Sequence, residues 1–283
     1  MKPYFETDLG KLYCGDCLEI MSHIDPVDLV LTSPPYDTIR SYDGYDFNFK
    51  ATAKLIKNTV KYGAVCVWIV GDQVIGGSET GTSFNQALFF ISIGFNLHDT
   101  MIYAKHPIPR THNRYEQAFE YMFVFSCGSP KTFNPLKQAT SCGGSIVKSA
   151  TIRKDSNNLS NYSGNGNKIK YNKIRSNIWF YETGFNKSTK DKFAFEHPAI
   201  FPDLLAVDHI ESWSNPGDLI LDTFLGSGTT AVACEQLNRR WIGIEISEKY
   251  CEIAAKRIER ERQQLKLFDP IIETPKPKQQ DMF

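Results

Sequence analysis

Several features that mark particular protein classes are missing from this chain of 283 residues. It contains no run of about 18 apolar residues, so we expect no membrane-spanning helix. Residues 1–8 do not form the apolar part of a signal peptide, and we therefore expect a cytoplasmic protein. Neither sign of charge predominates, because Lys plus Arg and Asp plus Glu number 32 each. Net charge alone therefore indicates no polyanionic partner.

A disulfide framework is not indicated either, because seven cysteines in a chain of this size do not suggest one. Cys14 and Cys17 have the spacing of half a zinc site. Neither a second cysteine pair nor a cluster of histidines follows them, so we expect no bound metal.

The chain does contain an alternation of short apolar runs with helical patterns. Continuous apolar runs such as Val27–Leu31 and Ala64–Val70 predict strands that are buried on both faces. Strands that alternate with helices predict an α/β fold with a doubly wound, mostly parallel sheet. The other predicted strands are Lys11–Asp16, Leu97–Tyr103, Tyr121–Phe125, Leu219–Asp222 and Trp241–Ile246. The predicted helices are Phe49–Tyr62, Phe84–Ile93, His197–Trp213, one from the 223–230 turn to Asn238, and Glu248–Leu265.

The stretch Thr32–Tyr36, with the sequence Thr-Ser-Pro-Pro-Tyr, follows the predicted strand Val27–Leu31. Two consecutive prolines cannot continue a sheet ladder, so the chain must turn at Ser33, at a carboxyl strand end, where open α/β sheets bind ligands. The Ser33 hydroxyl and the Pro34 carbonyl can accept hydrogen bonds there, and the Tyr36 ring can stack. These groups suit a planar substrate with an exocyclic amino group. A proline-rich turn with a surface tyrosine is the alternative.

A second unit runs from the strand Leu219–Asp222 through a glycine-containing turn and a helix to a strand that ends near Glu245. Units of this kind bind nucleotides, and the acid at the second strand end hydrogen-bonds ribose. Glu245 lies 19 residues after Gly226, which matches the spacing of about 20 residues expected for that role. The turn lacks the third glycine of a dinucleotide fingerprint and the lysine of a P-loop. A cofactor that has adenosine but no pyrophosphate fits better, and S-adenosylmethionine is such a cofactor.

Residues 127–192 differ in composition from the rest of the chain. They contain 12 Lys and Arg residues but only three acids, Asp155, Glu182 and Asp191. A neutral protein that concentrates positive charge in one segment has a candidate surface for phosphate groups, and a solvated face is the alternative. We expect residues 266–283, which are rich in Pro, Lys and Gln, to form a flexible tail. The candidate phosphate contacts are Lys168, Lys170, Lys173 and Arg175.

Three stretches resemble the motifs of DNA methyltransferases that act on exocyclic amino groups: Thr32–Tyr36, Asp222–Thr230 and Gly243–Ile246. The catalytic stretch precedes the cofactor stretch, and a basic segment lies between them, which is the order of the β group of that family. The resemblance implies a Rossmann-like class I methyltransferase fold with permuted motif order. It further implies a catalytic domain of residues 1–126 and 195–265, with residues 127–194 inserted as a target recognition domain that contacts double-stranded DNA.

The resemblance also assigns roles to individual residues. Gly226 and Gly228 would line the methionine end of S-adenosylmethionine, and Glu245 would hold its ribose. Asp16 and Cys17 would meet the adenine, although Asp16 would equally suit a helix cap. The segment His197–Phe201 is similar to the start of a helix that closes over the methionine portion. The expected catalytic residues are Ser33, Pro34, Pro35 and Tyr36, and the expected cofactor-binding residues are Asp16, Cys17, His197, Phe201, Asp222, Phe224, Gly226, Gly228, Thr229 and Glu245.

The resemblance implies direct methyl transfer to the amino group of a flipped base. Methylation at cytosine C5 would instead need a thiolate, usually from a cysteine after a proline, and no cysteine of this chain follows a proline. In this family, serine before Pro-Pro more often accompanies cytosine N4 than adenine N6, so we expect cytosine N4, with adenine N6 as the alternative.

Further alternatives are a protein amide or RNA base as substrate, and an inactive DNA-binding remnant. A bacterial or phage origin, a separate cognate restriction endonuclease and a homodimer are all compatible with the resemblance.

Overall fold

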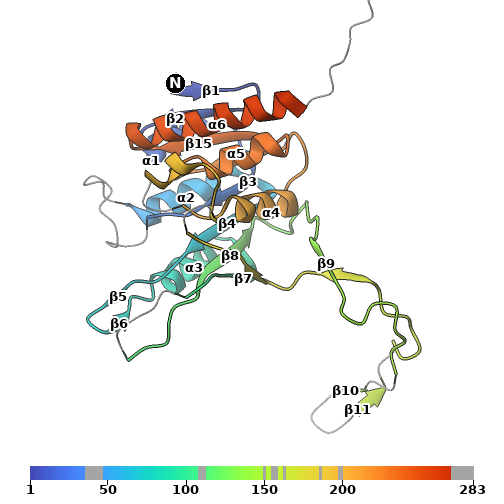
Figure 1. The fold of residues 1–283 in the computed structure, drawn as a ribbon. Coiled ribbons are helices and arrows are strands. Elements are labelled where there is room, and N and C mark those ends of the chain that lie inside the picture. The colour runs from blue at the N-terminus through green and yellow to red at the C-terminus, as the bar shows by residue number, and fades with distance from the viewer. Residues whose placement is uncertain are drawn as a thin grey trace, which may run out of the picture.

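A computed structural model describes residues 1–35, 47–107, 113–148, 151–153, 159–161, 164–184, 187–196 and 200–268. These residues build a nine-stranded sheet with the order β1-β2-β15-β14-β3-β4-β8-β7-β13 (Figure 1). Its strands are β1 (Phe5–Glu6), β2 (Gly10–Cys14), β3 (Val27–Thr32), β4 (Val60–Val70), β7 (Asn96–Ala104), β8 (Phe119–Ser126), β13 (Ile178–Phe180), β14 (Leu219–Asp222) and β15 (Arg240–Glu245).

The centre of the sheet is parallel. β2, β15, β14, β3 and β4 pair in parallel with one another in that order, and β13 is parallel to β7. β8 runs antiparallel to both β4 and β7. No helix separates β7 from β8 among the described residues, and strands without a crossover connection pair antiparallel. The prediction of an α/β fold with a mostly parallel, doubly wound sheet is confirmed.

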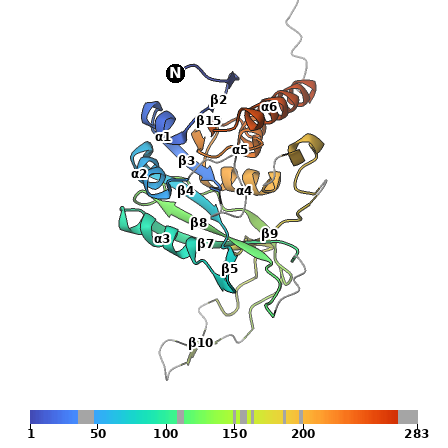
Figure 2. The same cartoon turned by 90° about the vertical axis from the view of Figure 1, so that its left-hand side faces the viewer.

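Helices cover both faces of the sheet, with α1, α2 and α3 on one side and α4, α5 and α6 on the other (Figure 2). Ile56 and Phe90 belong to the buried cluster of the first face, and Ile210 and Ile258 to that of the second. Because both faces are covered, the central parts of β3 and β4, residues 29–31 and 64–70, are continuously apolar rather than alternating. The helices are α1 (Cys17–Ile20), α2 (Phe49–Thr59), α3 (Thr82–Ser92), α4 (Asp203–Trp213), α5 (Thr229–Gln236) and α6 (Glu248–Phe268), with the short 3₁₀ helices η1 (Met21–His23) and η2 (Lys192–Glu196).

In the part of the chain that the structure describes, no helix combines the length and the apolar character that crossing a membrane requires. α6 is the longest of them, and charged side chains are spread along its whole length.

Some predicted boundaries are wrong. The helix predicted over Phe49–Tyr62 ends before Val60, where β4 begins with extended backbone angles. Val60, a β-branched residue that the periodicity assigned to the helix, instead pairs with Val27 of β3 in the sheet. The helix predicted from His197 begins only at Asp203, because Pro202 occupies the N-cap position with extended backbone. A proline also disfavours helical geometry in the residue before it. Residues 71–81, which include four glycines, contain the hairpin of β5 (Val74–Ile75) and β6 (Ser78–Glu79).

The middle of the predicted insertion leaves the sheet as an extended arm, formed by the described residues between 137 and 174, which projects from the body of the protein (Figure 1). In the arm, β9 (Lys137–Ala139) pairs with β12 (Asn172–Ile174), and β10 (Thr151–Arg153) pairs with β11 (Leu159–Asn161). The chain then returns to the main sheet as β13, and Trp179 and Tyr181 are buried in the core. The last part of the range 127–194 therefore packs with the sheet.

One buried histidine gives the core a pH dependence. His209 of α4 is fully buried, with its Nε2 3.1 Å from the Met122 sulfur and its ring against that of Trp179. Its Nδ1 has no hydrogen-bond partner among the described residues. Burial lowers the pKa of His209 from 6.5 to about 3, and the nearby Arg175 acts in the same direction.

We expect His209 to make the protein less stable in mild acid. The unfolded chain binds a proton at this residue below about pH 6.5, whereas the folded chain does so only near pH 3, so stability is lost as the pH falls through this window. One such group lowers the free energy of unfolding by about 2 kcal/mol between pH 7 and pH 5. Urea denaturation measures the free energy of unfolding at pH 7 and at pH 5. In His209→Gln, the difference between these two free energies should be smaller by that amount. The exposed His98→Gln is the control, and equal pH dependence in both variants would contradict the expectation.

Candidate functional site

A cavity of about 620 Å³ opens at the carboxyl ends of the central strands. Residues 33–35, which follow β3, and residues 223–227, which follow β14, line the same cavity although they are far apart in the sequence. Asp16 and Cys17 after β2, and Glu245 at the end of β15, complete this end of it. The two predicted motifs therefore meet at one site, as expected of ligands at carboxyl strand ends. Among the predicted residues, those that line the cavity are Asp16, Cys17, Ser33, Pro34, Pro35, Phe201, Phe224, Gly226, Thr229 and Glu245.

Tyr36 and His197 lie outside the described residues, so their predicted roles stay predictions. Phe201 lies before α4 rather than at the start of a helix.

Asp222 joins the two motifs but does not line the cavity. It is 1% exposed and accepts hydrogen bonds from the hydroxyls of Thr32 (2.7 Å) and Thr230 (2.6 Å) and from the Phe224 amide (3.0 Å). Burial raises the pKa of Asp222. The three hydrogen-bond donors oppose that rise by favouring the charged form, and the Thr230 hydroxyl has the largest effect of the three. The prediction that Asp222 binds the cofactor is therefore corrected: its oxygens fix the end of β3 against the turn after β14. Thr32, which the sequence analysis did not single out, supplies the matching hydroxyl.

Glu245 does face the cavity. It is 8% exposed, and its carboxylate accepts the amide N–H of Gly226 (2.8 Å) and that of Ser247 (2.9 Å). Burial raises the pKa of Glu245, and the Ser247 and Gly226 amides oppose the rise by favouring the charged form. A carboxylate can accept more bonds than these two, so Glu245 is oriented by the backbone and is able to hold ligand hydroxyls.

The two glycines of the turn have different functions. Gly226 lines the cavity and has a positive φ of 54°, which favours glycine. Gly228, with φ of 90°, lies against α6, and a Cβ at this position would be 3.0 Å from the Cα and Cβ of Ala254. The prediction that Gly228 lines the cofactor is corrected, because this glycine permits the close approach of α6.

Asp16 and Cys17 occupy one corner of the cavity. Asp16 accepts the Leu18 amide at 2.8 Å and so caps α1, which means that the capping interpretation and the cavity position both hold. Cys17 is the one cysteine of the seven that lines the cavity, and burial raises its pKa to about 11. Its thiol is therefore protonated at neutral pH. Among the described residues, no group of three or more His, Cys, Asp and Glu side chains is placed to hold a metal ion.

Arg257 is a residue that the sequence analysis missed. Its side chain is fully buried in α6, and its guanidinium donates to the Ser227 carbonyl (2.9 Å), the Thr229 hydroxyl (3.0 Å) and Asp203 (2.8 Å). It also contacts Thr189 and Asp191 at 3.2 Å each. One cation thus connects the glycine turn, the start of α4 and the segment before it. An arginine in a helix rich in charged residues gives no sequence signal of burial.

The basic residues divide into two groups. Lys168, Lys170 and Lys173 are exposed on the arm. Arg175 instead pairs with Asp208 at 2.7 Å, and its guanidinium lies 4.7 Å from the centre of the Trp179 ring. Arg175 therefore anchors the base of the arm to α4, and its predicted contact with DNA stays a prediction.

The comparisons with known proteins agree with this geometry. A family model for DNA methylases of the N6 and N4 type matches residues 27–256. The chain belongs to this family. It is 50% identical over 248 residues to the orphan methyltransferase M.BamHII of Bacillus amyloliquefaciens, covering 86% of this chain and 90% of that protein.

Solved structures show the same fold. The PvuII DNA methyltransferase, described as cytosine-N4-specific, superposes with a TM-score of 0.66 at 20% identity and covers 93% of each chain. The complex of M1.HpyAVI with S-adenosylmethionine gives a TM-score of 0.58 at 22% identity, covering 88% of this chain and 100% of the other. The protein is a site-specific DNA methyltransferase of the N4/N6 family, and it uses S-adenosylmethionine.

Replacing Glu245 with alanine should weaken S-adenosylmethionine binding by about 1–3 kcal/mol, the cost of losing hydrogen bonds to a charged group. Calorimetry measures the affinity. Glu235→Ala is the matched control, because Glu235 is equally buried, at 7%, but does not line the cavity. Glu235→Ala should lower stability and leave the affinity unchanged. Unchanged affinity in Glu245→Ala would rule out the assignment.

Proposed function

We propose that this methyltransferase transfers the methyl group to the exocyclic N4 amino group of cytosine in double-stranded DNA. The observation that carries the proposal is the position of Ser33 and Pro34 in the same cavity as the glycine turn and Glu245. A base held by Ser33 and Pro34 would have its amino group beside the methyl donor.

The cavity fits the cofactor. Glu245, oriented by two backbone amides, would hold the ribose hydroxyls, and Gly226 lets the backbone come close to the ligand. Phe224 and Phe201 supply apolar surface in the same cavity. When bound there, S-adenosylmethionine supplies a methyl group on a sulfonium, an electrophile that an amino nitrogen can attack directly.

Ser33 and Pro34 would prepare the amino group. The lone pair of an amino nitrogen on a base is delocalised into the ring, which makes it a poor nucleophile. If the Ser33 hydroxyl and the Pro34 carbonyl accept its two N–H bonds, the nitrogen is favoured in a pyramidal form and its lone pair is released for attack. Catalysis of this kind depends on orientation and fixed dipoles. The clamp of Asp222 on Thr32 keeps Ser33 in register with the cofactor turn.

The choice of cytosine over adenine rests on the family resemblance, because serine before Pro-Pro more often accompanies cytosine N4, whereas adenine-N6 enzymes usually have Asp or Asn there. A neutral hydroxyl is also a weaker acceptor than a carboxylate. Adenine N6 is the second candidate. The covalent route to cytosine C5 needs a thiolate, usually from a cysteine after a proline, and no cysteine of this chain follows a proline. The target cannot be reached inside a duplex and must be flipped out.

The test is to methylate DNA from cells that lack DNA methyltransferases, digest it to nucleosides and separate the products by mass spectrometry. We expect N4-methylcytosine. N6-methyladenine alone would overturn the choice of base, and 5-methylcytosine would overturn the mechanism. Sequencing of the same DNA identifies the recognition sequence.

The arm is proposed to contact DNA phosphates. Replacing Lys168, Lys170 and Lys173 together with glutamine should weaken DNA binding and flatten its salt dependence, by about 0.9 slope units for each phosphate that these lysines neutralise. Cofactor affinity should not change. A control that replaces three exposed lysines of the body, Lys54, Lys61 and Lys249, should leave the slope unchanged. Equal slopes for the two triple variants would mean that the arm lysines are only solvated.

A further inference from the structure

The cavity has a second wall that neither motif supplies. The ends of β7 and β8 and the residues next to them contribute it, on the antiparallel side of the sheet. His106 of this wall packs edge-on against Phe180 of β13, with ring centres 4.9 Å apart, so the returning strand supports it. The residues of this wall are Tyr103, Lys105, His106, Gln117 and Glu120.

An ion pair lies in this wall. The Lys105 ammonium contacts the Glu120 carboxylate, and the two side chains are only 18% and 17% exposed. The register of the strands places Tyr103 opposite Glu120, and the Lys105 ammonium lies 5.6 Å from the centre of the Tyr103 ring. Both charges are thus largely removed from water and held against a cavity.

Stability alone is a weak reason for such a pair. Largely buried ion pairs lose hydration that their attraction only partly restores, and apolar replacements are often neutral or stabilising. The pair Lys61 and Asp28 shows the contrast, because it lies near the start of β4, 44% and 26% exposed, and outside this cavity. A cation kept in the cavity wall is explained better by a ligand that accepts hydrogen bonds.

The proposed substrate offers such acceptors. Next to the amino group of cytosine, the ring edge presents N3 and then O2, both of which accept hydrogen bonds. Next to the amino group of adenine, the same edge presents N1 and then a carbon-bound hydrogen. A single ammonium group, with three donors, can bond both acceptors of cytosine but only one of adenine.

We propose that Lys105, held in place by Glu120, donates hydrogen bonds to N3 and O2 of the flipped cytosine and so selects this base. The inference rests on the proposed function, since it assigns the residue that reads the base whose amino group Ser33 and Pro34 hold. Lys105 takes no part in the transfer itself. Its contribution is base binding and discrimination.

Lys105→Met tests the proposal, with Lys61→Met as the matched removal of a paired lysine outside the cavity. The probe is the same unmethylated duplex DNA, and the readouts are the initial rates of N4-methylcytosine and N6-methyladenine formation, the affinity for S-adenosylmethionine and the melting temperature. Lys105→Met should lower N4-methylcytosine formation by on the order of 10- to 100-fold, as expected when bonds to a charged donor are removed. The share of N6-methyladenine in the product should rise, while cofactor affinity stays unchanged. Lys105→Arg, which keeps charged donors, should recover part of the rate.

The outcomes separate this inference from the proposed function. If the wild type forms N4-methylcytosine and Lys105→Met forms it at the same rate, the inference is wrong and the proposed function stands. If Lys105→Met loses cofactor affinity and melting temperature in proportion to its rate, the pair is structural and the inference is also wrong. If the wild type forms N6-methyladenine alone, the proposed base is wrong, and so is the proposed contact of Lys105 with O2 of cytosine.

Discussion

Replacing Arg257 with methionine is expected to lower the free energy of unfolding by roughly 3 kcal/mol, the lower end of the loss seen when one partner of a buried ion pair is removed. Arg257 is fully buried, whereas its partners Asp191 and Asp203 are 17% and 31% exposed. In the variant, water can therefore hydrate the two carboxylates in part, which reduces the loss of stability. The methionine would also leave the Ser227 carbonyl without its donor. Because Ser227 and Thr229 line the cavity, cofactor affinity should fall with stability.

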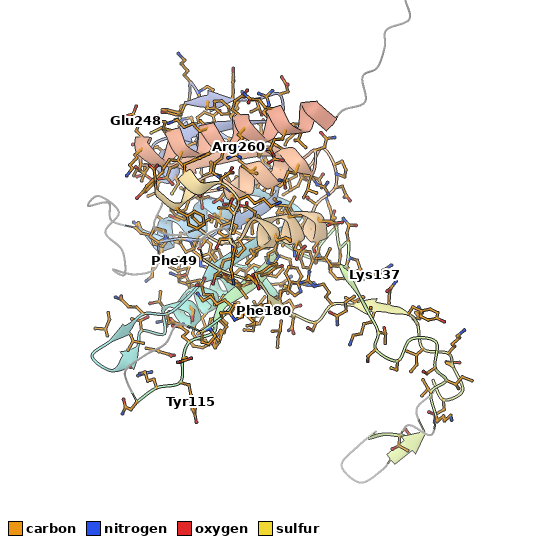
Figure 3. All side chains as sticks on the ribbon, viewed as in Figure 1. Phe49, Tyr115, Lys137, Phe180, Glu248 and Arg260 are labelled. Carbon is orange, nitrogen blue, oxygen red and sulfur yellow. The ribbon has the colours of Figure 1, made fainter. Side chains whose placement is uncertain are left out.

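Arg260 provides the control within the same network. It lies on the next turn of α6 (Figure 3). It donates to Asp191 at 2.9 Å, but its side chain is 49% exposed. Arg260→Met should therefore cost less than about 1 kcal/mol. Urea denaturation of both variants gives the comparison, and Arg257→Lys should fall between them, because lysine cannot reproduce the planar fork of donors. Similar small losses in Arg257→Met and Arg260→Met would show that the buried network does not stabilise the turn.

Replacing Ser33 with alanine is expected to reduce kcat by about 10²–10³, the range found when one fixed hydrogen-bonding group is removed from a reacting centre. The substitution deletes only the hydroxyl oxygen from a half-buried side chain, so the free energy of unfolding should fall by no more than the roughly 0.5–1.5 kcal/mol that one hydrogen bond contributes. Affinity for S-adenosylmethionine should not change, because Glu245 and Gly226, which are proposed to hold this ligand, follow other strands of the sheet than Ser33 does.

Ser33→Thr is the matched variant, since it keeps the hydroxyl and should retain most of the rate. Single-turnover measurements of methyl transfer, with saturating cofactor and DNA, isolate the chemical step. A wild-type rate in Ser33→Ala would mean that the hydroxyl does not hold the amino group. A rate reduced equally in Ser33→Ala and Ser33→Thr would point to packing at the turn instead.

The sequence was sufficient for features that depend on neighbouring residues. Continuous apolar runs predicted the central strands, because a strand buried on both faces needs no polar alternation. The prolines after Thr32 and the glycines after Asp222 marked the ends of two strands, since backbone geometry is restricted at the first and relaxed at the second. The order of these motifs implied the family, and the family model confirms it.

Other features depended on partners that are distant in the sequence. Asp222 and Glu245 are both acids at strand ends, but only the packing of Thr32 and Thr230 shows that the first is buried and the second faces the cavity. Arg175 carries the same charge as the arm lysines, and only Asp208 of α4 distinguishes it from them.

The antiparallel wall with Lys105 and Glu120, and the burial of Arg257, were decided in the same way by tertiary structure. A residue's own type and its neighbours determine its backbone geometry and its tendency to be buried. Which atom it contacts is determined by the strand or helix that lies beside it, and that element comes from elsewhere in the chain. The sequence by itself therefore determined the strands, the turns and the family, whereas the tertiary structure decided which charged side chains hold the fold and which face the ligand.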